Sequence, residues 1–153
     1  MKWFTYILSC TVILCVTSCK ETEKDTKPTE AISKTEQNDC IEQIFDQDSM
    51  YGASRNIRCM ELSLSQTITQ YVSEIRSMNF EACPKSFDDA FESHALAWLD
   101  IRSVTDKYPE LRGEMHDLFD LIEKTEDSLI FKKKLKSIWD TWAEVEKASG
   151  MGE

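Results

Sequence analysis

The chain has 153 residues, enough for about one domain, and its 28 acidic and 18 basic side chains give a formal net charge of −10. This excess of acids disfavours a nucleic-acid partner, because binding to phosphates needs concentrated lysine and arginine. It also disfavours unaided adhesion to anionic lipid. The charge favours a cationic protein or peptide as partner, the alternative being that the acidity only keeps the domain soluble.

The first eighteen residues have the pattern of an export signal. Lys2 supplies one positive charge, and residues 3–16 are apolar. This run of about fourteen residues is shorter than the roughly 20 that cross a bilayer as a helix. It therefore fits the core of a signal peptide better than a permanent membrane helix. The apolar run ends at Cys19, where charged residues begin.

Residues 16–19, Val-Thr-Ser-Cys, resemble the lipobox of bacterial lipoproteins, in which an aliphatic residue and two small residues precede a cysteine. The resemblance implies cleavage between Ser18 and Cys19 and attachment of acyl chains such as palmitate to Cys19. Cys10 and Cys15 are weaker candidates, because further apolar residues follow each of them. The alternatives are an ordinary signal peptide cut nearby or an uncleaved anchor. Loss of Lys2 with the signal would change the net charge from −10 to −11.

The residues after Cys19 predict where the chain resides and how it is tethered. Lys20 and the acids beyond it resemble the signal that exports lipoproteins of Bacteroidota to the cell surface, which implies the outer membrane. Ile32 is the only large apolar residue in residues 20–38, so we expect a flexible linker that reaches on the order of 25 Å. The predicted organisation is a signal peptide over 1–18, a lipidated cysteine and linker over 19–38, and a helical domain over 39–153.

Beyond the linker, apolar residues recur every three or four positions, the spacing of a helix with one buried face. We expect a short first helix that begins at Asn38 or Asp39 and ends near Gly52. A longer second helix is expected over residues 57–78, whose apolar residues keep the same spacing.

Three more helices are expected after a break over residues 79–85. The Ser-x-x-Asp pattern at 86–89 predicts the start of the third, and Pro109 marks its end. The fourth covers residues 111–122 and the fifth residues 127–148. No segment alternates as a strand would. The predicted fold is therefore an all-α bundle of four main helices plus a short leading helix.

Three cysteines, Cys40, Cys59 and Cys83, remain after the signal and the lipidated residue are set aside. An exported protein enters an oxidising compartment, so we expect one disulfide and one free thiol. All three pairings are open from the sequence. The spacings contain no zinc motif, and no cofactor is expected.

His94 and Trp98 are the residues most suited to bind a ligand. They are four apart on an apolar stripe of the third helix, which comprises Phe87, Phe91, His94, Trp98 and Ile101. A histidine there can ligate or transfer protons, but it can equally be a core residue with one hydrogen bond. The sequence lacks nucleophile, phosphate-loop and metalloprotease motifs, so no enzymatic activity is expected.

The last predicted helix adds two weaker candidates. Lysines at 132, 133, 134 and 136 form a basic run that either contacts lipid headgroups or an acidic partner, or is a solvated face. Trp139 and Trp142 do not fit one narrow buried face together. One of them is therefore expected to be partly exposed, where a tryptophan can anchor a partner.

The order of Asp39 and Cys40, Cys59, the Ala-Trp-Leu at 97–99 and Arg102 resembles the lysozyme-inhibitor-like helical domain of envelope lipoproteins. That resemblance implies an all-α fold with disulfides and, as in some members, inhibition of host lysozyme. The chain departs from the family pattern by a long gap from Cys40 to Cys59 and by the absence of cysteine after Arg102. No functional residue is carried over.

The sequence thus favours a membrane-anchored binding module of the bacterial envelope, with a cationic protein such as lysozyme as a candidate partner. The alternatives are a bundle that binds a small ligand or metal near His94 and Trp98, or a structural envelope protein without a discrete ligand.

Overall fold

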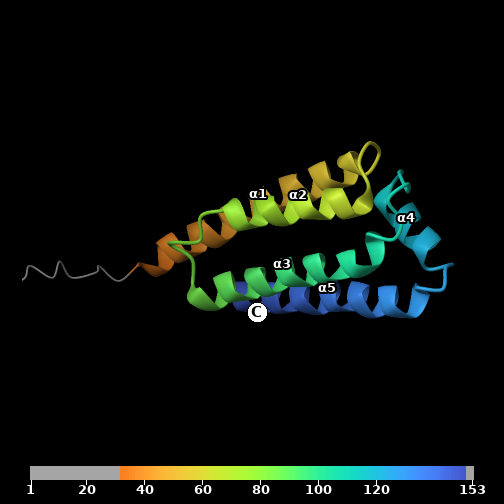
Figure 1. Ribbon diagram of the computed structural model, residues 1–153. Helices are drawn as coiled ribbons and strands as arrows, with labels where there is room; N and C mark the ends of the chain where they lie inside the picture. The colour runs from red at the N-terminus through yellow and green to blue at the C-terminus, as the bar shows by residue number, and fades with distance from the viewer. Residues whose placement is uncertain (1–31, 151–153) are drawn as a thin grey trace, which may run out of the picture. The chain divides into compact units, whose positions relative to one another are not determined.

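Five helices make up the described part of the chain, residues 32–150 of a computed structural model, and no strand occurs there. The predicted all-α bundle is confirmed (Figure 1). The predicted signal peptide over 1–18 and the lipidation site at Cys19 lie outside the described residues. The helices are α1 (Lys34–Arg58), α2 (Leu64–Ser77), α3 (Lys85–Thr105), α4 (Met115–Ile122) and α5 (Ser128–Ser149).

The four long helices run alternately up and down the bundle, and α4 crosses at the end where α3 stops and α5 begins (Figure 1). The most extensive helix contact is between α3 and α5, followed by α2 with α3 and α1 with α2. Across the described residues, α1 and α5 have no comparably extensive backbone contact. The backbones of α1 and α5 therefore lie farther apart than those of the three pairs just named.

The core lies between the helices and is dense in aromatic rings. All five residues of the predicted α3 stripe are buried, which confirms the orientation of that helix. Phe45, Phe87, Phe91 and Trp142 form a cluster in which ring centroids lie 5.1–6.2 Å apart. Aromatic pairs at this spacing stabilise a core beyond the area that they bury.

The first helix is longer than predicted at both ends. Its N-cap is Ser33, whose hydroxyl accepts from the Glu36 amide while the Glu36 carboxylate accepts from the Ser33 amide. This capping box places the start of α1 inside the stretch predicted to be linker, ahead of Asn38 and Asp39. Gly52 lies within α1, because a single internal glycine costs only about 1 kcal/mol and tertiary packing offsets it.

The second helix is shorter than predicted. Its N-cap is Ser63, in a capping box with Gln66, so residues 59–63 separate α1 from α2. Ile57 and Met60, expected on the buried stripe of the second helix, are exposed. The helical spacing of apolar residues continues through the turn by coincidence. The N-cap residue Ser63 sets the start of α2.

The later helix ends follow the predictions more closely. Pro84 is the N-cap of α3 and contributes no side-chain hydrogen bond, while Ser86 lies inside the helix. The fifth helix ends at Gly150 in the left-handed conformation, with φ 66°. The leading helix is the longest, with 25 residues, and α4 is the short one, with eight.

One disulfide joins Cys40 on α1 to Cys83 in the loop before α3, with a Cα–Cα distance of 5.3 Å. Cys59 is the free thiol and is buried. The expected single disulfide is confirmed, and the structure selects one of the three pairings that the sequence left open. Among the described helices, none is both long and apolar enough to cross a membrane.

Candidate binding site

A cleft of about 160 Å³ opens between α1 and α5 and includes both residues singled out from the sequence, His94 and Trp98. Four helices contribute to it. We call it the α1–α5 cleft, and its lining comprises Asp48, Arg55, Tyr71, His94, Trp98, Ile138, Trp139 and Trp142. The backbones of α1 and α5 make few close approaches, although the rings of Phe45 and Trp142 meet between them with centroids 5.9 Å apart.

His94 has both ring nitrogens occupied by protein partners. Trp98 Nε1 donates to His94 Nε2 over 3.0 Å, so Nε2 is the unprotonated nitrogen. Nδ1 then carries the proton and donates to Thr141 Oγ1 over 3.1 Å. Burial lowers the pKa of His94 to about 4, so the ring is neutral at pH 7. His94 is therefore a satisfied core histidine, with no nitrogen left for a metal or for proton transfer.

Arg55 lies beside this pair and makes the cleft polar. Its guanidinium carbon is 4.4 Å from the ring centroids of both Tyr71 and Trp98, which meet edge to face with their own centroids 5.5 Å apart. Such cation–π contacts hold a cation in place without neutralising it. Arg55 Nε and Nη2 approach Asn56 Oδ1 only at 3.4 and 3.5 Å, which makes these hydrogen bonds weak.

Asp48 is the one carboxylate that lines the α1–α5 cleft. It is buried and accepts a hydrogen bond from the Tyr71 hydroxyl over 2.7 Å. Burial raises the pKa of Asp48, and the Tyr71 hydrogen bond and the charge on Arg55 oppose part of that rise. Burial and the neighbouring Asp48 charge also raise the pKa of Tyr71, so its hydroxyl stays protonated and remains a donor.

Asp48 and Arg55 were missed by the sequence analysis, although a signal existed. They are seven positions apart on α1, so they share one face of that helix. Ile41 and Ile44 lie on the same face and are buried. Asp48 and Arg55 thus continue the buried apolar face of α1 with polar side chains. Such a change from apolar to polar on one helix face indicates where the core opens to solvent.

The two tryptophans of α5 differ in their surroundings. Trp142 is half-buried among Phe45, Phe91 and His94, and its Nε1 donates to Glu146 over 2.9 Å. Trp139 lines the α1–α5 cleft but keeps 56% of its surface exposed. The expectation that one of the pair is partly exposed is met by Trp139.

The solvent side of α1 is a second candidate surface. Its first half carries Asp39, Glu42 and Asp46, all exposed, and none has an ion pair with another described residue. Met50 and Ile57 continue the same side and are 60% and 71% exposed. We call these five residues the outer face of α1. Acids and apolar side chains thus lie in sequence along one helix.

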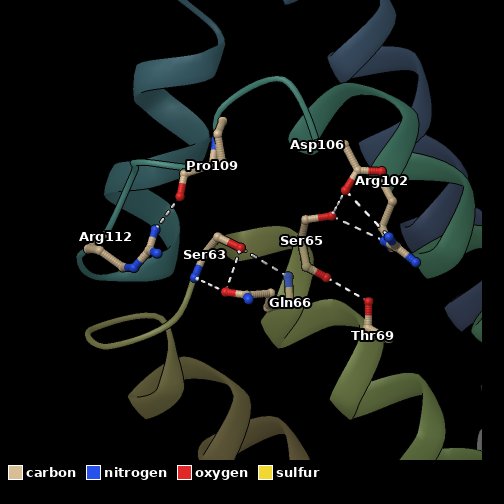
Figure 2. A pocket seen from close by; sticks show the side chains of 8 residues that line it. All are labelled: Ser63, Ser65, Gln66, Thr69, Arg102, Asp106, Pro109 and Arg112. Atoms are coloured by element: carbon tan, nitrogen blue, oxygen red, sulfur yellow. Dashed lines mark hydrogen bonds and ion pairs between the residues drawn. The ribbon is translucent and has the colours of Figure 1, made fainter.

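Two further clefts differ in how far their own side chains satisfy one another. In the first, Arg102 Nε donates to Ser65 and its Nη2 lies 3.4 Å from Asp106, whereas Arg112 donates to backbone carbonyls, among them that of Pro109 (Figure 2). The second lies beside the disulfide and is lined by acids and amides. No group of three or more potential metal ligands gathers anywhere in residues 32–150.

The remaining sequence candidates are dispersed. Lys132, Lys134 and Lys136 pair with Glu123, Asp100 and Asp140, so most of the basic run is a neutralised surface. Cys59 is far from being a reactive thiol, because burial raises its pKa. Neither feature adds to the α1–α5 cleft.

Comparisons with protein-family models, with curated proteins and with solved structures found no match to this chain.

Proposed function

We propose that this chain is a lipid-anchored protein of the bacterial envelope, held to the outer membrane through Cys19, and that its helical domain binds a cationic protein. Lysozyme is the first candidate partner, from the resemblance of the sequence to lysozyme-inhibitor-like domains. The outer face of α1 is the surface that we assign to this interaction.

The observation that carries the proposal is the arrangement of charge and apolar surface on α1. Asp39, Glu42 and Asp46 have no cationic neighbour within ion-pair distance in the described part of the chain, so their charge is available to a partner. Met50 and Ile57 adjoin them. Interfaces combine apolar contact with charge, and the apolar part supplies the burial that surface ion pairs alone do not provide.

Electrostatics gives such an interface a clear signature. An acidic surface steers a cationic protein toward it and raises the association rate, and salt screens this attraction over about 8 Å at physiological ionic strength. Binding through the outer face of α1 should therefore weaken steeply as salt is added, mainly through slower association.

The test uses purified protein and hen or human lysozyme at low and high salt, followed by binding kinetics and by lysis of a bacterial cell-wall suspension. A triple variant, Asp39→Lys, Glu42→Lys and Asp46→Lys, should abolish binding. A matched variant, Glu110→Lys, Asp120→Lys and Glu126→Lys, makes the same charge change at exposed positions away from α1 and should retain most of the binding. Equal losses in both variants would show that only net charge matters, and absence of any binding would remove lysozyme as the partner.

The anchor is tested separately by intact mass. The full chain, expressed in a bacterium that processes lipoproteins, should lose residues 1–18 and gain acyl chains. Cys19→Ala should block both changes and release the protein from the membrane fraction. An unprocessed wild-type mass would contradict the envelope assignment but leave the binding measurement unaffected.

A further inference from the structure

Arg55 is distinguished from every other cation in residues 32–150 by its surroundings. It is half-buried, and no carboxylate lies within ion-pair distance of it. Most of the other arginines in this region, Arg58, Arg76 and Arg102, each pair with an acid. Arg112, the remaining one, is exposed and donates to backbone carbonyls. In a domain so rich in acids, a half-buried arginine without a carboxylate at ion-pair distance keeps its capacity for charge-assisted hydrogen bonds.

The cleft holds this cation between two aromatic rings. Tyr71 and Trp98 are nearly perpendicular to each other and both lie 4.4 Å from the guanidinium carbon, and the guanidinium N–H groups have only the weak hydrogen bonds to Asn56. A guanidinium edge matches a carboxylate through two parallel hydrogen bonds. Because the rings hold Arg55 in advance, a ligand would not have to order a long flexible side chain on binding.

The buried polar side chains of the cleft, His94, Trp98, Tyr71 and Asp48, hydrogen-bond within the protein. Trp98 and His94 bond to each other, and His94 also bonds to Thr141. Asp48 accepts from Tyr71, so its carboxylate offsets part of the Arg55 charge without bonding to the guanidinium. Arg55 is thus the cationic donor that the α1–α5 cleft offers to a ligand.

The remaining wall is apolar and reaches the surface. Ile138, Trp139 and Trp142 lie on the α5 side, and Trp139 is the exposed member. A space of about 160 Å³ holds a compact group rather than an extended chain. Small-molecule sites have this composition, mostly apolar with a few placed polar groups, and this cleft lies at the small end of the range.

We propose that the α1–α5 cleft binds a carboxylate attached to a small apolar or aromatic group, with the carboxylate on the Arg55 guanidinium and the apolar part against Trp139. This site is separate from the outer face of α1. Binding of a small carboxylate and binding of a cationic protein are therefore independent properties of the domain.

The first experiment titrates the purified protein with sodium benzoate and with benzamide, its neutral counterpart of the same shape. Side-chain NMR signals of tryptophan Nε1–H and arginine Nε–H report on the site. Benzoate should shift the Trp139 and Arg55 signals in a saturable way, and benzamide should bind roughly tenfold more weakly or worse. Equal binding of the two compounds, or benzoate shifts confined to residues outside the cleft, would overturn the proposal.

Variants then assign the contacts. Arg55→Gln should weaken benzoate binding at least about tenfold, and Arg55→Lys should give an intermediate loss, since it keeps the charge without the paired donors. Arg76→Gln removes an exposed arginine on α2 and is the matched control, expected to bind as the wild type. If circular dichroism shows that Arg55→Gln does not fold, the proposal is tested with Arg55→Lys and Trp139→Ala instead. Unchanged benzoate affinity in both variants would reject the site.

A final arm identifies the source of the carboxylate. N-Acetylphenylalanine mimics the end of a peptide chain, whereas benzoate mimics a free small acid. Tighter binding of the first assigns the cleft to a chain terminus, and tighter binding of the second assigns it to a small molecule. Failure of both to bind would reject the carboxylate class and would say nothing against a protein partner on the outer face of α1.

Discussion

At the scale of single residues, the cleft contains a chain of hydrogen bonds that fixes the protonation of His94. The chain runs from Trp98 to His94 to Thr141, and the Thr141 hydroxyl in turn donates to the Ile138 carbonyl over 2.9 Å. Each group has the partner that its donor or acceptor requires only when the imidazole is neutral. If Nε2 were protonated, its N–H would face the Trp98 Nε1–H, and two donors cannot hydrogen-bond to each other.

This arrangement predicts how stability depends on pH. Burial holds the pKa of His94 at about 4 in the folded protein, below the roughly 6.5 of an unfolded chain, so the unfolded state binds more protons between these values. The free energy of unfolding should therefore fall as the pH is lowered from about 6.5 to about 4, by on the order of 3 kcal/mol from this residue. Below that window the contribution of His94 levels off.

Chemical denaturation at several pH values, for the wild type and His94→Gln, measures this effect. Asp48 acts in the opposite direction, since its raised pKa makes the folded state the better proton binder, so only the difference between the two proteins isolates the histidine. Parallel pH profiles would contradict the assignment. An NMR titration that places the pKa of His94 near 6.5 would contradict it as well.

The hydrogen bond from Tyr71 to Asp48 gives a second prediction at this scale. Tyr71→Phe keeps the ring against Arg55 but leaves the buried carboxylate without its donor, so the free energy of unfolding should drop by about 1–3 kcal/mol. The double variant Tyr71→Phe with Asp48→Asn should lose less than the sum of the two single changes. Strict additivity in urea denaturation would show that the two groups do not interact.

Residue type and spacing were enough to predict that His94 and Trp98 lie together in the core. They were not enough to predict Arg55, because its site depends on rings from α2 and α3 that the chain order does not place beside it. The open side of the cleft could not be predicted for the same reason. Only the tertiary arrangement shows that the backbones of α1 and α5 stand apart beside the cleft.

At the scale of the helices, the N-cap residues set where helices begin, and the spacing of apolar residues does not. Ser33 and Ser63 each form a capping box with the residue three positions on, and both start a helix. Ser86 has a similar sequence context yet lies within α3, whose N-cap is Pro84. Periodicity thus located the helices, whereas the choice among several serines needed the backbone conformation.

Paired substitutions test this distinction. Ser33→Ala removes the acceptor for the Glu36 amide and should lower the free energy of unfolding by about 1 kcal/mol, with faster hydrogen exchange at the start of α1. Ser86→Ala, at an exposed position without a capping bond, should change it by less than about 0.5 kcal/mol. A larger loss from Ser86→Ala would mean that Ser86 is the effective cap.

At the scale of the whole domain, the disulfide is the strongest single constraint. It closes a loop with a sequence separation of 43 residues, which restricts the unfolded chain by an amount equivalent to about 2–4 kcal/mol. The variant Cys40→Ala with Cys83→Ala should lose stability in that range. Cys59→Ala should lose clearly less, because it removes a buried thiol but no cross-link.

Guanidinium denaturation of these variants, with and without reductant, checks the prediction. Reduction should destabilise the wild type and Cys59→Ala alike and leave the double alanine variant unchanged. Sensitivity of the double variant to reductant would point to a different pairing. The fold class followed from helical periodicity over most of the chain, but the pairing did not, since three cysteines allow three bridges and only packing brings Cys40 to Cys83.

The position of the disulfide also determines how the domain responds to mechanical force. A pull applied at the start of α1 can unwind only the helix before Cys40, about two turns, because the bridge passes the tension directly to the loop before α3. The rest of α1, including Asp48 and Arg55, lies beyond that point. In a protein held in a moving fluid by its N-terminal end, the first turns of α1 would therefore stretch while Asp48 and Arg55 stay off the line of tension, and the bridge would act as a stop.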